Sequence, residues 1–119
     1  MTPFTFVITD IKLNNTAKAK HILCQGELDE SNVDFHAETI YDLIHLVPKG
    51  THFVLDGKSL AYLNSKALGY LTDWFNKLDQ KGGRIFLVNL KPAIFDVLDV
   101  VGITQIISVH DKVADIELN

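Results

Sequence analysis

The most recognisable chemical motif in the sequence is Gly57-Lys58-Ser59, which matches the last three positions of the phosphate-binding loop G-x-x-x-x-G-K-[ST]. That loop also requires a glycine where this chain has His52, because its first turn is tight. Asp56 would in addition repel a phosphate beside the loop. We therefore interpret the stretch as a turn after a strand and expect no nucleotide cofactor.

Residues that bind metals or transfer protons form no recognisable set. The five histidines and the single Cys24 make no H-x-x-x-H or C-x-x-C pair, so we expect no metal site. Two acidic pairs at helical spacing, Asp34 with Glu38 and Asp96 with Asp99, are typical of a solvated helix face. Because no acid, base and nucleophile converge, we expect that the protein is not an enzyme.

Ser65 marks the place where the sequence indicates function, because a loop enters the second predicted helix there. It has no G-x-S-x-G elbow and no neighbouring histidine, which argues against a hydrolase nucleophile. Its side chain is instead suited to capping the helix. The unpaired N–H groups and the positive dipole end of a helix start favour an anionic group or a partner loop. We therefore expect a binding site at this helix start.

Length and composition define the class of protein. The 119 residues correspond to one domain, residues 1–119, and 47% hydrophobic with 22% charged residues is typical of a globular fold. Eleven basic and fifteen acidic residues give a net charge of −4, which argues against nucleic acid as a partner. Without a secretory signal or a membrane span, and with a single cysteine, the sequence predicts a cytoplasmic protein that does not insert into membranes.

Short apolar runs predict the strands. Phe4–Leu13 and Lys20–Gln25 look like a hairpin, with Asn14-Asn15 as a turn signal between them. Three later runs are typical of buried parallel strands: His52–Leu55, Arg84–Val88 and Ile106–Val109.

Apolar residues at spacings of three and four predict the helices. The first extends from Val33 to Val47, with Asp29 or Ser31 as its cap. The second carries its apolar stripe from Leu68 to Leu78, and we interpret Gly69 as allowing the helix to pack closely on the sheet.

The third helix begins near Pro92 and ends at Gly102, and a brief terminal helix follows from Asp111 through Ile116. This alternation predicts an α/β fold with a mixed, mostly parallel sheet. We expect an antiparallel N-terminal edge strand and helices packed mainly on one face.

Four stretches of the sequence resemble the STAS family, the domains typified by bacterial anti-sigma-factor antagonists, and the resemblance runs from Phe4 to Ile116. The element order is the family's own, so the resemblance implies the same fold. The stretches are Gly26–Asp29 before the first helix, His52–Gly57 with Leu60–Leu71, Gly82–Asn89, and Phe95–Ile103.

In the family, the loop before the second helix commonly reads D-S-S-G-L-G or D-S-T-G-L-G. Its second hydroxyl residue is phosphorylated by the partner kinase, which is also the anti-sigma factor. In this chain the stretch Asn64–Gly69 reads N-S-K-A-L-G, so Lys66 occupies the acceptor position. Ser65 lies one position early and is a fallback acceptor. We therefore expect a constitutively unphosphorylated domain, with an acidic patch on the partner opposite Lys66.

The resemblance implies a protein-interaction module in bacterial transcription regulation that binds its partner through Asn64, Ser65 and Lys66. Asp29 and Asp56 each follow a strand, so we expect both near the same helix start as further contact residues. The partner would be an anti-sigma factor with serine-kinase activity. Two alternatives stay open: a STAS subunit that clamps the ATPase of an ABC-type lipid transport or other regulatory assembly, and a small-ligand binder at the same helix start.

Overall fold

The computed structural model describes residues 1–118 of the chain. None of the helices formed by these residues has the length and apolar character that a membrane span requires. The elements, in chain order, are β1 (Phe4–Leu13), β2 (Ala17–Leu28), α1 (Val33–Leu46), β3 (His52–Leu63), α2 (Ser65–Gln80), β4 (Ile85–Val88), α3 (Pro92–Val100), the 3-10 helix η1 (Ile103–Gln105), β5 (Ser108–His110) and the 3-10 helix η2 (Val113–Asp115).

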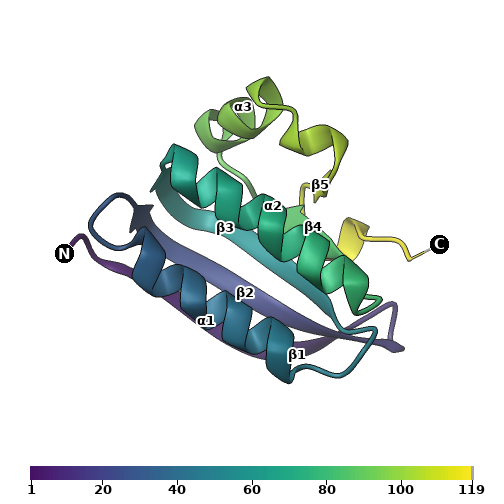
Figure 1. Cartoon of the computed structure of the whole chain (residues 1–119). Helices are drawn as coiled ribbons and strands as arrows, with labels where there is room; N and C mark the ends of the chain where they lie inside the picture. Colours follow the sequence, from purple (N-terminus) through teal and green to yellow (C-terminus); the bar gives the residue numbers. More distant parts are fainter. Residues whose placement is uncertain (119) are drawn as a thin grey trace.

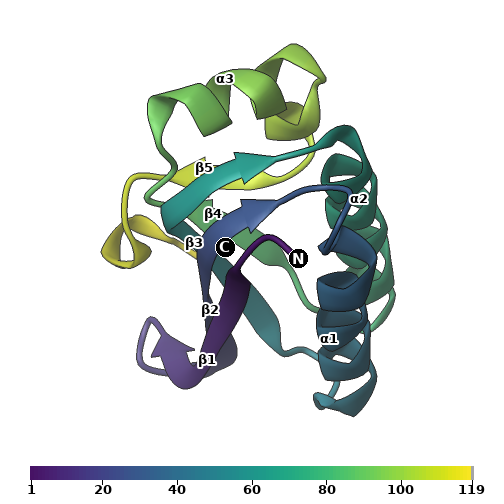
Figure 2. The same ribbon diagram turned by 90° about the vertical axis from the view of Figure 1, so that its left-hand side faces the viewer.

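The strands form a single five-stranded sheet in the order β1-β2-β3-β4-β5. β1 and β2 are antiparallel, and the other neighbours are parallel. Figure 1 shows α1 and α2 side by side in front of the sheet, and the turned view in Figure 2 shows both helices on one side of the strands. The predicted mixed sheet with an antiparallel edge strand is confirmed.

The main core lies between the sheet and the helices, as the predicted stripes require. Ala37, Ile40 and Ile44 of α1 are buried there, and Val33 is buried in a smaller cluster with Leu28 and Ala67. Leu71, Trp74 and Leu78 of α2 and Ile94 and Leu98 of α3 join the main core. The opposite face of the sheet carries a smaller cluster in which the C-terminal segment around Ile116 covers Val54, Phe86 and Val88.

Strand β3 continues to Leu63, so the expected end at Leu55 and the turn at Gly57-Lys58-Ser59 are wrong. Its pairing with β2 shifts register where Leu23 and Gln25 face Asp56 and Ser59, so β3 accommodates an extra residue instead of turning. A Cβ at Gly57 would lie 2.7 Å from the Cδ2 atom of Leu90. Glycine at this position therefore allows close packing within a strand.

The hairpin is tighter than expected, because β2 begins at Ala17 rather than at Lys20. Asn14 and Asn15 have φ values of 50° and 62°, and Thr16 N donates to Leu13 O at 3.1 Å. Positive φ at both central residues is the requirement of a type I′ turn, and asparagine tolerates it better than most residues. The predicted turn signal is confirmed.

Three smaller expectations are wrong. An added Cβ at Gly69 would meet nothing within 4 Å, so this glycine faces open space and not the sheet. The last strand is β5 at Ser108–His110 instead of Ile106–Val109, because the N–H groups of Ile106 and Ile107 both donate to Ile103 O at the end of η1. The terminal helix is only the 3-10 turn η2.

Candidate partner-binding site

The start of α2 is capped by Asn64 and not by Ser65. The Oδ1 atom of Asn64 accepts from Ala67 N at 3.0 Å, and Ser65 is the first helical residue. The backbone N–H of Asn64 also donates to Leu28 O at 3.0 Å, which fixes the loop to the end of β2. Asparagine caps helices as well as serine does, so the expected cap was one residue too late. Ser65 is exposed, and its hydroxyl does not cap the helix.

Lys66 forms an ion pair with a residue of the neighbouring helix α1. Its Nζ atom lies 2.8 Å from Asp34 Oδ1, and the Tyr70 hydroxyl donates to the same oxygen at 2.6 Å. The hydrogen bond from Lys66, followed by that from Tyr70, lowers the pKa of the Asp34 carboxyl below its usual value. Lys66 therefore already has an acidic neighbour within its own chain, which weakens the reason for expecting an acidic patch on the partner.

Asp29 lies in the loop before α1 and orders the start of the chain. Its Oδ1 atom accepts from Ser31 N at 2.9 Å, and its Oδ2 atom accepts from the Thr2 hydroxyl. The hydrogen bond from Thr2 is the main cause that lowers the pKa of the Asp29 carboxyl. Asn32, and neither Asp29 nor Ser31, is the residue before the first turn of α1.

Sequence reasoning missed Asn32, which is 1% exposed. Its side-chain amide donates to Thr2 O and to Glu27 O, each at 2.8 Å, and its Oδ1 atom accepts from Asp29 N at 2.9 Å. The only sign of its role in the sequence was its position, between the expected cap residues and the first apolar residue of the helix. Asn32 therefore holds Asp29 in place beside the start of α2.

The expected contact residues of the two helix starts lie around adjoining polar depressions. One, of about 450 Å³, is lined by Asn64, Ser65 and Lys66 together with residues of the α1 start and β3. The other, of about 420 Å³, brings Asp29 and Asn64 to the same surface. The structure therefore places four of the five candidate residues together.

Asp56 is the exception, and its expected position near the start of α2 is wrong. It lies within β3, near Val54 on the face of the sheet that α1 and α2 do not cover, and it is 3% exposed. Its Oδ2 atom accepts from His21 Nε2 at 2.9 Å and from Asn89 Nδ2 at 3.1 Å, and its Oδ1 atom accepts from Lys58 N at 3.0 Å. Asp56 therefore supports the fold from the far side of the sheet.

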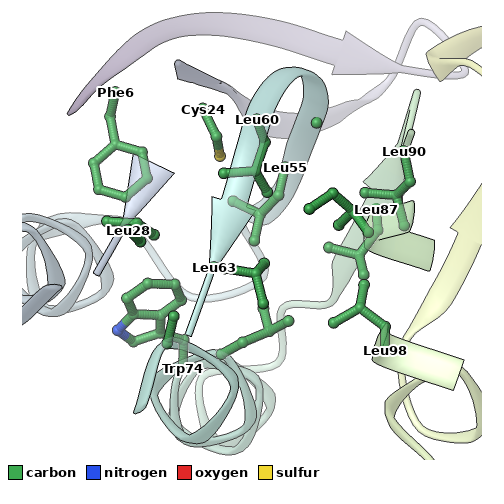
Figure 3. Close-up of a pocket in the computed structure, with 14 residues that line it drawn as sticks. Phe6, Cys24, Leu28, Leu55, Leu60, Leu63, Trp74, Leu87, Leu90 and Leu98 are labelled. Carbon is green, nitrogen blue, oxygen red and sulfur yellow. The ribbon is translucent and has the colours of Figure 1, made fainter. Parts of the chain in front are cut away.

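Beneath α2 and α3 there is an apolar cavity of about 50 Å³, shown in Figure 3 with the residues that line it. This volume is far below the roughly 150 Å³ that accommodates benzene, so it does not suit an organic ligand. Cys24 lines the cavity, and burial raises the pKa of its thiol to about 12. The thiol is therefore protonated and unreactive at neutral pH.

Within residues 1–118, no three His, Cys, Asp or Glu side chains gather in a way that would hold a metal ion. The lysine of the incomplete phosphate-binding motif lies in β3, and its backbone N–H is bound by Asp56. The arrangement at the α2 start thus offers an exposed polar surface and a capped helix.

The chain is similar to known proteins over most of its length. Residues 11–116 match the STAS domain family. The anti-sigma F factor antagonist of Paenibacillus polymyxa is 28% identical over 87 residues, which cover 73% of this chain and 74% of that protein.

Solved structures show the same fold. An anti-sigma factor antagonist from Mycobacterium paratuberculosis superimposes with a TM-score of 0.79 at 18% identity, covering 95% of this chain and 90% of that chain. The anti-sigma factor antagonist SpoIIAA in its unphosphorylated form gives a TM-score of 0.72 at 19% identity, covering 91% and 90%.

Proposed function

Since the chain belongs to the STAS domain family, we propose that it acts as a protein-binding module of the anti-sigma-factor-antagonist type and not as an enzyme. The similarity to the Paenibacillus polymyxa antagonist supports this class of function. The observation that carries the proposal is the grouping of Asp29, Asn64, Ser65 and Lys66 around exposed depressions at the start of α2. A cytoplasmic location is part of the proposal, as the single cysteine indicates.

The proposed partner is an anti-sigma factor with serine-kinase activity. It would dock on the exposed turn of α2, where Gly69 leaves the helix surface flat next to Lys66. Because the Asn64 cap fixes this turn before binding, the partner meets a preformed surface and little ordering entropy is lost. Asp56 has no part in this contact, because it is buried on the other face of the sheet.

Lys66 is the residue on which the proposed regulation depends. A phosphate at this position would add about −1.5 to −2 charges beside Asp34, and like charges would separate α1 from α2. The lysine instead forms a permanent ion pair with Asp34. We therefore propose that this domain stays in the form that binds its partner and is not released by phosphorylation at residue 66.

Capture of the partner by tagged protein tests the proposed surface. The wild-type domain should retain an ATP-binding kinase-type anti-sigma factor, and Lys66→Glu should lose it, because two acidic residues would then face each other across α1 and α2. Lys77→Glu is the matched control, since it makes the same charge change on the exposed end of the same helix.

Equal retention by both variants would contradict the proposed surface. Retention of an ATPase with a permease would instead support the lipid-transport alternative, in which a STAS subunit clamps the ATPase.

A further inference from the structure

We propose that the outer edge of β1 pairs with the same edge of a second copy of this chain, so that two domains share one continuous sheet. β1 is an edge strand, and among the described residues, 1–118, its only neighbour in the sheet is β2. An unpaired edge exposes a row of N–H and C=O groups that are ready to pair with another strand. The inference goes beyond the proposed function, because the start of α2 takes no part in the pairing.

The direction of the backbone groups identifies which of them are free. Pro3 O accepts from Glu27 N of β2, and Leu13 O accepts from Thr16 N in the hairpin turn, so odd-numbered residues direct their carbonyls toward β2. Alternate residues of an antiparallel strand point to opposite sides. The outward groups therefore belong to the even-numbered residues Phe4, Phe6, Ile8, Asp10 and Lys12.

The middle of this edge carries no protection against pairing. The segment Phe4–Thr9 contains no charged residue, proline or glycine, whereas proteins usually protect an exposed edge with such residues. Val7 and Ile8 are 43% and 36% exposed, and as neighbours in a strand they point to opposite faces. Both faces of the edge therefore offer apolar surface to a second strand.

A two-fold axis through Ile8 uses every outward group. It pairs Ile8 with Ile8 of the second copy, Phe6 with Asp10, and Phe4 with Lys12. A register that pairs an even-numbered residue with an odd-numbered one would leave the outward groups without partners. The reason is that the N–H and C=O groups of a strand point to the same side at every second residue. This register therefore lets all the outward residues pair in an antiparallel and symmetric contact.

Charge along the strand favours a second copy over an unrelated extended segment. Lys12 lies directly opposite Lys18 across the hairpin, and like charges opposite each other are unfavourable. The other end of β1 is preceded by Thr2, whose hydroxyl binds Asp29. Antiparallel pairing brings Lys12 of each copy opposite Phe4 of the other, at the end of the strand where Asp29 lies. A lysine and an aspartate from different copies would therefore lie near each other at both ends of the contact.

Sedimentation velocity over a range of concentrations tests the inference. Because the contact is small, we expect a dissociation constant on the order of 10–100 µM, which increases with salt. Ile8→Pro removes an outward N–H and leaves the hydrogen bonds between β1 and β2 intact, so dissociation should become at least about tenfold easier. Ile8→Thr is the matched control, because it keeps the N–H and should keep the dimer.

Two further variants keep the test decisive. If Ile8→Pro does not fold, Ile8→Lys blocks the edge with a charge and should give the same loss of dimer. Lys12→Glu should weaken the dimer several-fold, whereas Lys58→Glu on β3 should not. A wild-type chain that is monomeric throughout the range, or a dimer that the edge variants leave unchanged, would overturn the inference. Partner capture should be the same for all these variants, so failure here is distinct from failure of the proposed function.

Discussion

Asp34 and Asp56 both bind residues distant in the sequence, but one lies at the surface and the other inside. Asp34 pairs with Lys66, and its side chain is 62% exposed. Asp56 accepts three hydrogen bonds, from His21, Asn89 and Lys58 N, and its side chain is 4% exposed. Water competes for the groups around Asp34 but not for those around Asp56. The comparison indicates that the buried carboxylate contributes more to the stability of the fold than the exposed one does.

Replacing the buried carboxylate should have the largest effect. Asp56→Ala leaves the donors from His21, Asn89 and Lys58 without their acceptor, so we expect the free energy of unfolding to fall by about 3–5 kcal/mol. Urea denaturation measures this loss. Asp56→Asn keeps one acceptor oxygen and should cost less, whereas a loss below about 1 kcal/mol for the alanine variant would show that the network contributes little.

The cap of α2 should have a smaller effect. Asn64→Ala removes the acceptor for Ala67 N and should lower the free energy of unfolding by about 1 kcal/mol. Ser65→Ala, one residue later, should leave it within about 0.5 kcal/mol of the wild type. The same denaturation experiment would disprove the assigned cap if the serine variant were the more damaging of the two.

Mild acid should lower the free energy of unfolding because a histidine binds a proton, and not because the ion pair of Asp34 with Lys66 is lost. Burial, and then the charge of Arg84, lowers the pKa of His52, whose Nδ1 atom accepts from Arg84 N at 3.0 Å. The unfolded chain therefore binds more protons as the pH falls through about 6.5, and stability decreases there. The pKa of Asp34 is lowered, so its contribution is lost only in stronger acid, below about pH 4.

Thermal unfolding at pH 7.5 and 5.5 tests this difference. The wild type should lose stability at the lower pH, and His52→Asn should lose less. Lys66→Ala should show the same decrease as the wild type. A pH response that depends on Lys66 would instead place the sensitive group in the surface pair.

The sequence predicted the sheet and the helix stripes because alternation of apolar periods is a local property. It did not predict that β3 continues beyond Asp56, since Asp-Gly usually indicates a turn. Two of the three donors that allow a buried carboxylate there, His21 and Asn89, come from segments distant in the sequence. Whether Asn64 or Ser65 is the cap depends on where α2 begins, to within one residue, and helix propensity does not locate a helix boundary that closely. The pairing of Lys66 with Asp34 depends on how α1 packs against α2, and no local pattern encodes that.

The intact mass of the protein after incubation with the proposed kinase-type partner and ATP tests the central claim most directly. The Lys66→Ser variant serves as the matched control, because it restores a hydroxyl at the position that the family phosphorylates. We predict one phosphoryl adduct on the variant and none on the wild type. A stoichiometric adduct on Ser65 of the wild type would contradict the claim that this domain is permanently unphosphorylated, and the absence of an adduct on both proteins would contradict a kinase-type partner.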